Sequence, residues 1–352
     1  MAIVCPASSD RGGLLAIGTV VVLLNAVGWG VLLAVVAPQD LQLGDAGGFG
    51  IGIGMTAFLL GARHAFDADH IAIIDNATRK LVGEGRPTMG TGLWFALGHS
   101  SVVFGLFLVL ALGVRAVAGS VQDENSALQH SFSVVGVLAA GMFLIVLGLM
   151  NLGALVGIAH AYKHVRAGTF DEDKLDHHLH NRGFLARIFK RATQRVSKPW
   201  HLYPLGLLMG LGFDTATQVA LLTLAGGTAA YALPWYAILV LPVLFTAGMT
   251  LFDTADGLFM AHAYKWAFLN PDRKIFYNFT VTLLSVLVAV TIGFIVLLQL
   301  VADEFSVAAV DWITSLDLEY VGFALVTAFV VIWVGSVGAF QLLERRRSET
   351  GH

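Results

Sequence analysis

Cysteine and charge are both scarce in this chain of 352 residues. Its single cysteine, Cys5, excludes a disulfide framework and any metal site built from several thiolates. A bound metal must therefore use His, Asp, Glu, Asn or backbone groups. Charged residues make up 13% of the chain, whereas a soluble domain carries about 25%. Together with the 57% hydrophobic content, this predicts an all-α, polytopic membrane protein.

Sequence motifs of common enzymes are also missing. No Gly-x4-Gly-Lys-Ser/Thr loop is present, so ATP hydrolysis by this chain is not expected. An intramembrane aspartyl protease is one alternative, because two membrane aspartates can form an acid/base dyad. However, Phe213 stands where a Gly-x-Gly-Asp motif would place its aspartate, and His-Glu-x-x-His does not occur. We therefore expect a protein that is not an enzyme.

Long apolar segments dominate the sequence, and segments of about 20 residues are typical of membrane-spanning helices. The first segment lacks the basic start and cleavage site of a signal peptide, so we expect it to be retained. Eight spans are predicted, at 14–36, 50–74, 90–114, 132–158, 202–224, 233–259, 276–301 and 320–340.

Lys and Arg are distributed unevenly between the two sets of loops. Of the 21 basic residues, 19 lie at the two ends or in alternate loops, which favours placing all of these on the cytoplasmic side. The opposite loops hold Arg115 and are otherwise neutral or acidic. We therefore predict cytoplasmic termini and a multi-pass protein of the cytoplasmic membrane.

We expect one membrane transport domain, 1–352, with a long cytoplasmic loop at 159–201. This loop carries His177, His178 and His180 beside several aspartates. These side chains could chelate a metal weakly, but a solvated charged loop is the preferred interpretation.

The span 50–74 contains five ionisable residues within eight positions: Arg63, His64, Asp67, Asp69 and His70. Each ionisable group in a bilayer costs about 2.5 to 3.5 kcal/mol, so the cluster needs a compensating role. Imidazole and carboxylate are ligands of divalent transition metals, and metal binding is favoured over a structural polar network. On one ideal helix, His64, Asp67 and His70 would share a face. Asp69 would then pair with Arg63 or orient a ligand.

Three other predicted spans contain polar side chains that could line an ion path. The aspartates could bind a cation, carry a proton or neutralise Arg63, and lining a polar path is favoured over packing for their two spans. A lone buried histidine is more often a packing residue than a ligand, although the glycine and hydroxyls beside His99 favour a ligand role somewhat. The residues are His99 in 90–114; Asp214, Thr217 and Gln218 in 202–224; and Asp253 and Asp256 in 233–259.

These residues carry a resemblance to the nickel/cobalt permease family, in four blocks that occur in the family's order. Two positions depart from the family pattern: Ser101 stands where Thr is usual, and Gln218 stands where Glu is usual. A glutamine can still offer an oxygen, but it cannot hold a negative charge or carry a proton. The matching blocks are His64-x4-Asp69-His70, residues 97–103 around His99, residues 211–217 around Asp214, and residues 248–256 ending at Asp256.

The resemblance implies uptake of Ni(II) or Co(II) across the cytoplasmic membrane by one polypeptide, without an ATPase subunit. The metal would be the transported substrate, and no resident cofactor is expected. The metal ion and the lipid bilayer are the expected partners, and nucleic acid is not. Membrane potential, with or without protons, would drive entry, and a metal exporter on the same scaffold is the alternative. The ligand candidates are His64, Asp67, Asp69, His70, His99, Asp214, Asp253 and Asp256, supported by Arg63, Thr217 and Gln218.

Overall fold

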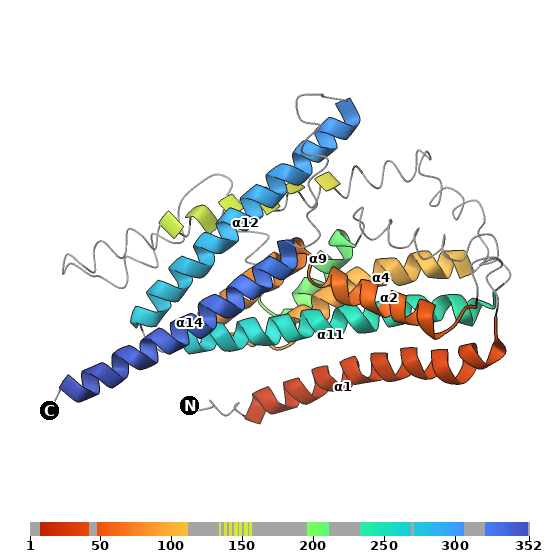
Figure 1. The fold of residues 1–352 in the computed structure, drawn as a ribbon, viewed down its shortest axis with the longest axis horizontal. Coiled ribbons are helices and arrows are strands. Elements are labelled where there is room, and N and C mark those ends of the chain that lie inside the picture. The colour runs from red at the N-terminus through yellow and green to blue at the C-terminus, as the bar shows by residue number, and fades with distance from the viewer. Residues whose placement is uncertain are drawn as a thin grey trace. The chain divides into compact units, whose positions relative to one another are not determined.

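The architecture is helical, and no β-strand occurs within the part of the chain that the structure describes. This confirms the all-α prediction. The structure is a computed structural model (Figure 1). It describes residues 8–41, 48–111, 196–210, 233–268, 271–305 and 321–350, and scattered positions in 134–156.

Five helical segments among the described residues are long and apolar enough to cross a membrane. Each coincides with one of the eight predicted spans. The predicted spans 132–158 and 202–224 lie largely outside the described residues, so the count of eight stays a prediction. The five segments are Gly12–Gln39, Thr91–Leu108, Trp235–Phe268, Phe279–Ala302 and Phe323–Leu342.

The chain divides into two compact units, each described here by itself. The first comprises residues 1–66, 86–140 and 198–259, and the second comprises residues 67–85, 141–197 and 260–352. Within the first unit lie α1 (Ser8–Val31), its π-helical and 3-10 extensions (Leu32–Val36, Ala37–Gln39), α2 (Ile51–His64), α4 (Thr91–Ala111) and α9 (Leu202–Met209). Helix α11 (Trp235–Phe268) begins in the first unit and ends in the second.

An apolar core holds the first unit together. It combines buried side chains of the π-helical extension, α2, α4 and α11, among them Val36, Ala57, Phe107 and Phe245. Outward positions of α1 and α2 are also apolar, as at Leu23 and Leu59, each 55% exposed. Apolar residues on both the inner and the outer surface are expected of helices that lie in lipid.

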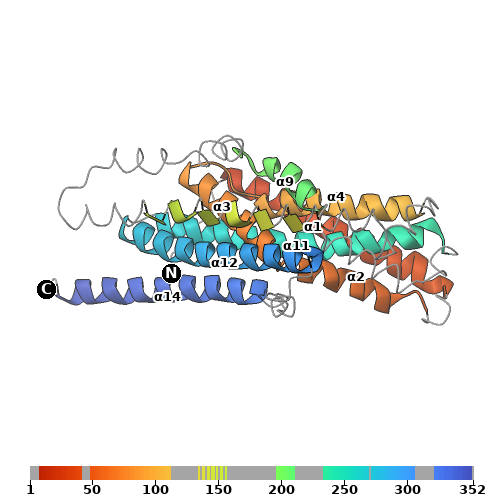
Figure 2. The same ribbon diagram turned by 90° about the horizontal axis from the view of Figure 1, so that it is seen from above.

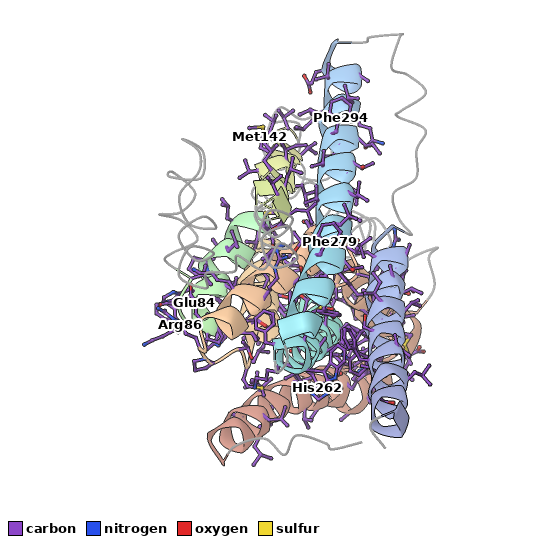
Figure 3. All side chains as sticks on the ribbon, turned by 90° about the vertical axis from the view of Figure 1, so that its left-hand side faces the viewer. Glu84, Arg86, Met142, His262, Phe279 and Phe294 are labelled. Carbon is purple, nitrogen blue, oxygen red and sulfur yellow. The ribbon has the colours of Figure 1, made fainter. Side chains whose placement is uncertain are left out.

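The second unit contains α3 (Ala68–Gly83), α12 (Pro271–Phe305) and α14 (Val321–Thr350). Helices α12 and α14 lie in contact and run antiparallel (Figures 1 and 2). Ala72 of α3 packs in a small apolar cluster with Ala289 and Ile292 of α12. Phe279 and Phe294 of α12 are exposed, at 38% and 58%, and Figure 3 labels both. This exposure is consistent with a lipid-facing surface.

The predicted continuous helix across 50–74 is wrong. Helix α2 ends at His64, and α3 starts at Ala68 after a turn in which the Phe66 N–H bonds to the Arg63 carbonyl at 2.9 Å. Asp67, with φ −66° and ψ 144°, is extended and occupies the N-cap position of α3. Aspartate favours this position over a helix interior, but apolar periodicity does not register such a break. The predicted shared face of His64, Asp67 and His70 therefore does not exist.

Candidate metal site

Two histidines distant in sequence meet inside the first unit. His64 is the last residue of α2 and His99 lies in the middle of α4; they are 3% and 2% exposed. Their Nε2 atoms are 2.9 Å apart, and their ring planes are inclined at 64°. One ring can donate the Nε2 proton while the other accepts it. If the donating ring carries its proton on Nδ1 instead, both Nε2 atoms offer a lone pair to a metal ion.

Close backbone packing positions His99. A Cβ atom on the preceding residue, Gly98, would overlap the carbonyl oxygen of Tyr203. A Cβ atom on Gly206 of α9 would likewise overlap the carbonyl oxygen of Phe95. Helices α4 and α9 therefore touch through backbone at small residues, which is a common packing mode in membranes. The Ser101 hydroxyl adds a hydrogen-bond contact of 2.8 Å with the Tyr203 hydroxyl.

Similar packing positions His64. Gly61, one turn earlier in α2, lies so close to α11 that a Cβ atom would overlap the Phe245 carbonyl oxygen. Gly248 of α11 is equally close to the Phe58 carbonyl oxygen of α2. The ring of Phe245 lies 5.9 Å from that of His64, measured between centroids. The His64 imidazole is thus held in an apolar, tightly packed environment.

His70 lies fully buried in the first turn of α3, within the second unit. Its backbone N–H donates to the Asp69 carboxylate at 3.0 Å, so Asp69 satisfies a helix-terminal N–H group. Asp67 and Asp69 are half-buried, whereas Arg63 is exposed at the end of α2. Within the first unit, the buried pair His64 and His99 offers two imidazole nitrogens that could bind a metal ion.

Asp253 and Asp256 lie one turn apart on α11, as predicted from their spacing. Asp253 is fully buried, and Asp256 is half-buried. A Cβ atom on Gly92 of α4 would overlap the Asp253 carbonyl oxygen, so α4 and α11 touch at this level. The ligand role of the two aspartates stays a prediction.

Several predicted residues fall outside the described part of the chain. Their functional roles therefore stay predictions. These residues are Asp214, Thr217 and Gln218 of the fifth predicted span, and His177, His178 and His180 of the 159–201 loop.

Sequence reasoning missed a buried polar cluster around Asp75 and Arg79 in the second unit. Asp75 is fully buried and accepts hydrogen bonds from Tyr264 and Ser285 at 2.5 and 3.3 Å. The predicted span ends at residue 74, so Asp75 and Arg79 lie outside it and are not among the candidate site residues. The signal was the sequence Asp75-Asn76-x-x-Arg79, whose spacing places all three on one side of a helix.

These features define a multi-pass α-helical membrane protein with a buried histidine pair, as expected of a metal-ion transporter. The family model "High-affinity nickel-transport protein" matches residues 50–338. The chain belongs to this family of nickel transporters.

Several named relatives are transport proteins, which are not enzymes. The chain is similar to "Nickel transporter NicT" of Mycobacterium tuberculosis, at 51% identity over 89% of this chain and 85% of that protein. It is 40% identical to "High-affinity nickel transport protein" of Cupriavidus necator, over 96% and 95% of the two chains. It is also 40% identical to "Cobalt transport protein NhlF" of Rhodococcus rhodochrous, over 83% of each chain. No solved structure matches the chain.

Proposed function

We propose that this protein imports Ni(II), and also Co(II), across the cytoplasmic membrane through an intramembrane site of histidines and aspartates. The ligand candidates are those named from the sequence, with His64, His70 and His99 at the centre. The observation that carries the proposal is the buried contact of 2.9 Å between the Nε2 atoms of His64 and His99. The relatives named for nickel and cobalt transport support the choice of ions.

The spacing of the two nitrogens suits a particular coordination geometry. Two imidazole nitrogens bound at about 2.1 Å, with about 90° between them, lie about 3.0 Å apart. Adjacent positions of an octahedral or square-planar ion have this angle. Tetrahedral coordination would separate them by about 3.4 Å. The observed 2.9 Å is close to the octahedral or square-planar spacing, and the rings, which now face each other in a hydrogen bond, would turn toward a shared ion.

The end of α2 also favours a cation. His64 is the last residue of this helix, where unsatisfied carbonyl groups and the helix dipole give a partial negative charge. The N-terminus of α3 has the opposite polarity, and Asp69 in its first turn offsets this positive end. A broken helix with polar ends is a common way for transporters to build an ion site within the membrane.

Energetically, entry needs no ATPase subunit. An inside-negative potential favours entry of a divalent ion by about 4.6 kcal/mol per 100 mV, twice the value for one charge. We propose that this potential drives uptake and that the protein acts as a single polypeptide in the bilayer. Proton coupling would add to this driving force.

The test is the uptake of radioactive nickel by cells that express the protein, compared with cells carrying an empty vector. Nickel should accumulate, unlabelled Co(II) should compete, and collapse of the membrane potential should slow entry. Depletion of cell nickel on expression would instead identify an exporter. Equal nickel content with and without the protein would contradict a transport role.

A further inference from the structure

The buried Asp75 carboxylate and the half-buried Arg79 guanidinium, one turn apart on α3 and coupled by their charges, each gather hydrogen bonds within the second unit. The two sets of contacts are together called the Asp75–Arg79 network. Tyr264 of α11 and Ser285 of α12 donate to the two oxygens of Asp75. Arg79, one turn further along α3, donates to the Thr282 hydroxyl of α12 at 2.5 Å. None of these contacts belongs to the candidate metal site.

Two amide side chains complete the network. Arg79 also donates to the Asn76 side-chain oxygen at 2.5 Å and to that of Asn151 at 2.7 Å. The network thus connects α3 to α11, α12 and the helical residue at position 151. Hydrogen bonds require a defined distance and direction. These contacts therefore fix the position of α3 along its own axis and its rotation about that axis.

Other packing of α3 is less directional. Its apolar contacts, through the buried Ile71, Ile74 and Leu81 and through Ala72 in the cluster with α12, are non-directional. Helix α3 is not a continuation of α2, because the chain is extended at Asp67. The position of α3 is therefore not fixed by α2. A buried carboxylate is costly where it lacks partners, so a slip of α3 that took Asp75 away from Tyr264 and Ser285 would be unfavourable.

We propose that Asp75 and Arg79, with Tyr264 and Thr282, are positioning residues for the metal ligand His70. His70 lies five residues before Asp75 on α3, a rise of about 7.5 Å. A slip of α3 by one residue would shift His70 by about 1.5 Å and rotate it by about 100°. The network therefore sets where the His70 imidazole is presented. This inference rests on the proposed function, because it takes His70 as a ligand.

Tyr264 and Tyr277 provide a matched pair of variants. Both side chains are fully buried, and their rings lie 5.7 Å apart. The Tyr264 hydroxyl donates to Asp75, whereas the Tyr277 hydroxyl makes no hydrogen bond within the described residues. Tyr264→Phe removes one hydrogen bond that holds α3, and Tyr277→Phe removes the same atom from the same neighbourhood without removing any hydrogen bond of the network. Thr282→Val keeps the side-chain shape and removes the hydroxyl that accepts a hydrogen bond from Arg79. It therefore tests the contribution of Arg79.

The experiment measures nickel binding by the purified full-length protein, and the KM and Vmax of uptake per amount of protein in the membrane. Tyr264→Phe and Thr282→Val should each raise the Kd and the KM about tenfold, the range typical for residues that orient a ligand, with unchanged metal stoichiometry. Tyr277→Phe should stay within about twofold.

A purely structural role would lower the amount of protein or Vmax and leave the Kd and the KM unchanged. That result, or equal Kd values for Tyr264→Phe, Thr282→Val and Tyr277→Phe, would overturn the inference. If the unaltered protein bound no nickel, the proposed function itself would be contradicted, and the inference with it. The two failures are therefore distinguishable.

Discussion

The Nε2 atoms of His64 and His99 lie 2.9 Å apart, although 35 residues separate the two histidines in the chain. The contact depends on close packing rather than on the histidines alone. Gly61 and Gly98 let their helices approach the carbonyl oxygens of Phe245 and Tyr203. The contact between the two histidines therefore depends on the close helix packing that these glycines permit. The histidines and the glycines can each be tested by substitution.

We expect Gly98→Ala to destabilise the protein by about 1 to 3 kcal/mol, the usual cost of overpacking. The added methyl group would overlap the backbone carbonyl of Tyr203, which cannot rotate away as a side chain could. Gly105→Ala on the same helix is the matched control, because no atom lies within 4 Å of the position of its Cβ. The thermal midpoint of the purified protein measures the difference. Equal midpoints for the two variants would show that α4 and α9 do not touch at Gly98.

The predicted orientation can be tested by cysteine labelling after Cys5 is replaced by serine. Single cysteines at Ser197 and Ser348 should resist an impermeant reagent in intact cells and react after lysis, since basic loops are retained inside. Ser126→Cys, in a loop predicted to be external, is the positive control. Labelling of Ser348→Cys from outside in intact cells would contradict cytoplasmic placement of the C-terminus.

Gln218→Glu should change the rate of nickel uptake or its pH dependence more than it changes folding. The new carboxylate would lie one turn from Asp214 if this segment is helical, and it would add negative charge and a proton-binding group to the proposed path. Uptake kinetics across a pH series measure the effect, with Gln218→Met as an uncharged control. If the Glu variant matched the parent in affinity, rate and pH profile, position 218 would be a passive lining residue.

Composition and apolar length were sufficient to predict the helical class and the five candidate spans that the structure shows. Motif residues were sufficient to predict the family, because the resemblance rests on His64, Asp69, His70 and the three other blocks. The break between His64 and Ala68 could not be predicted this way, since apolar length gives the outer bounds of a span and does not register an interruption within it.

The Asp75 cluster was missed for a different reason. Its partners Tyr264, Thr282 and Ser285 are about 190 to 210 residues away in sequence, and single polar residues in apolar helices do not reveal their contacts. The contact between His64 and His99 likewise depends on how the helices pack. Local patterns therefore identified candidate ligands but not their geometry.

The most direct test of the central claim is nickel uptake at low external nickel by His64→Ala, His70→Ala and His99→Ala proteins, normalised to the amount in the membrane. Each should lose roughly a hundredfold or more in apparent affinity, since changes at groups that only orient a ligand already cost about 10 to 100-fold. Asp69→Ala should also lose high-affinity uptake. His262→Ala, an exposed histidine of α11 labelled in Figure 3, should transport normally. Near-normal uptake by well-expressed His64→Ala and His70→Ala proteins would contradict the assignment of these histidines as metal ligands.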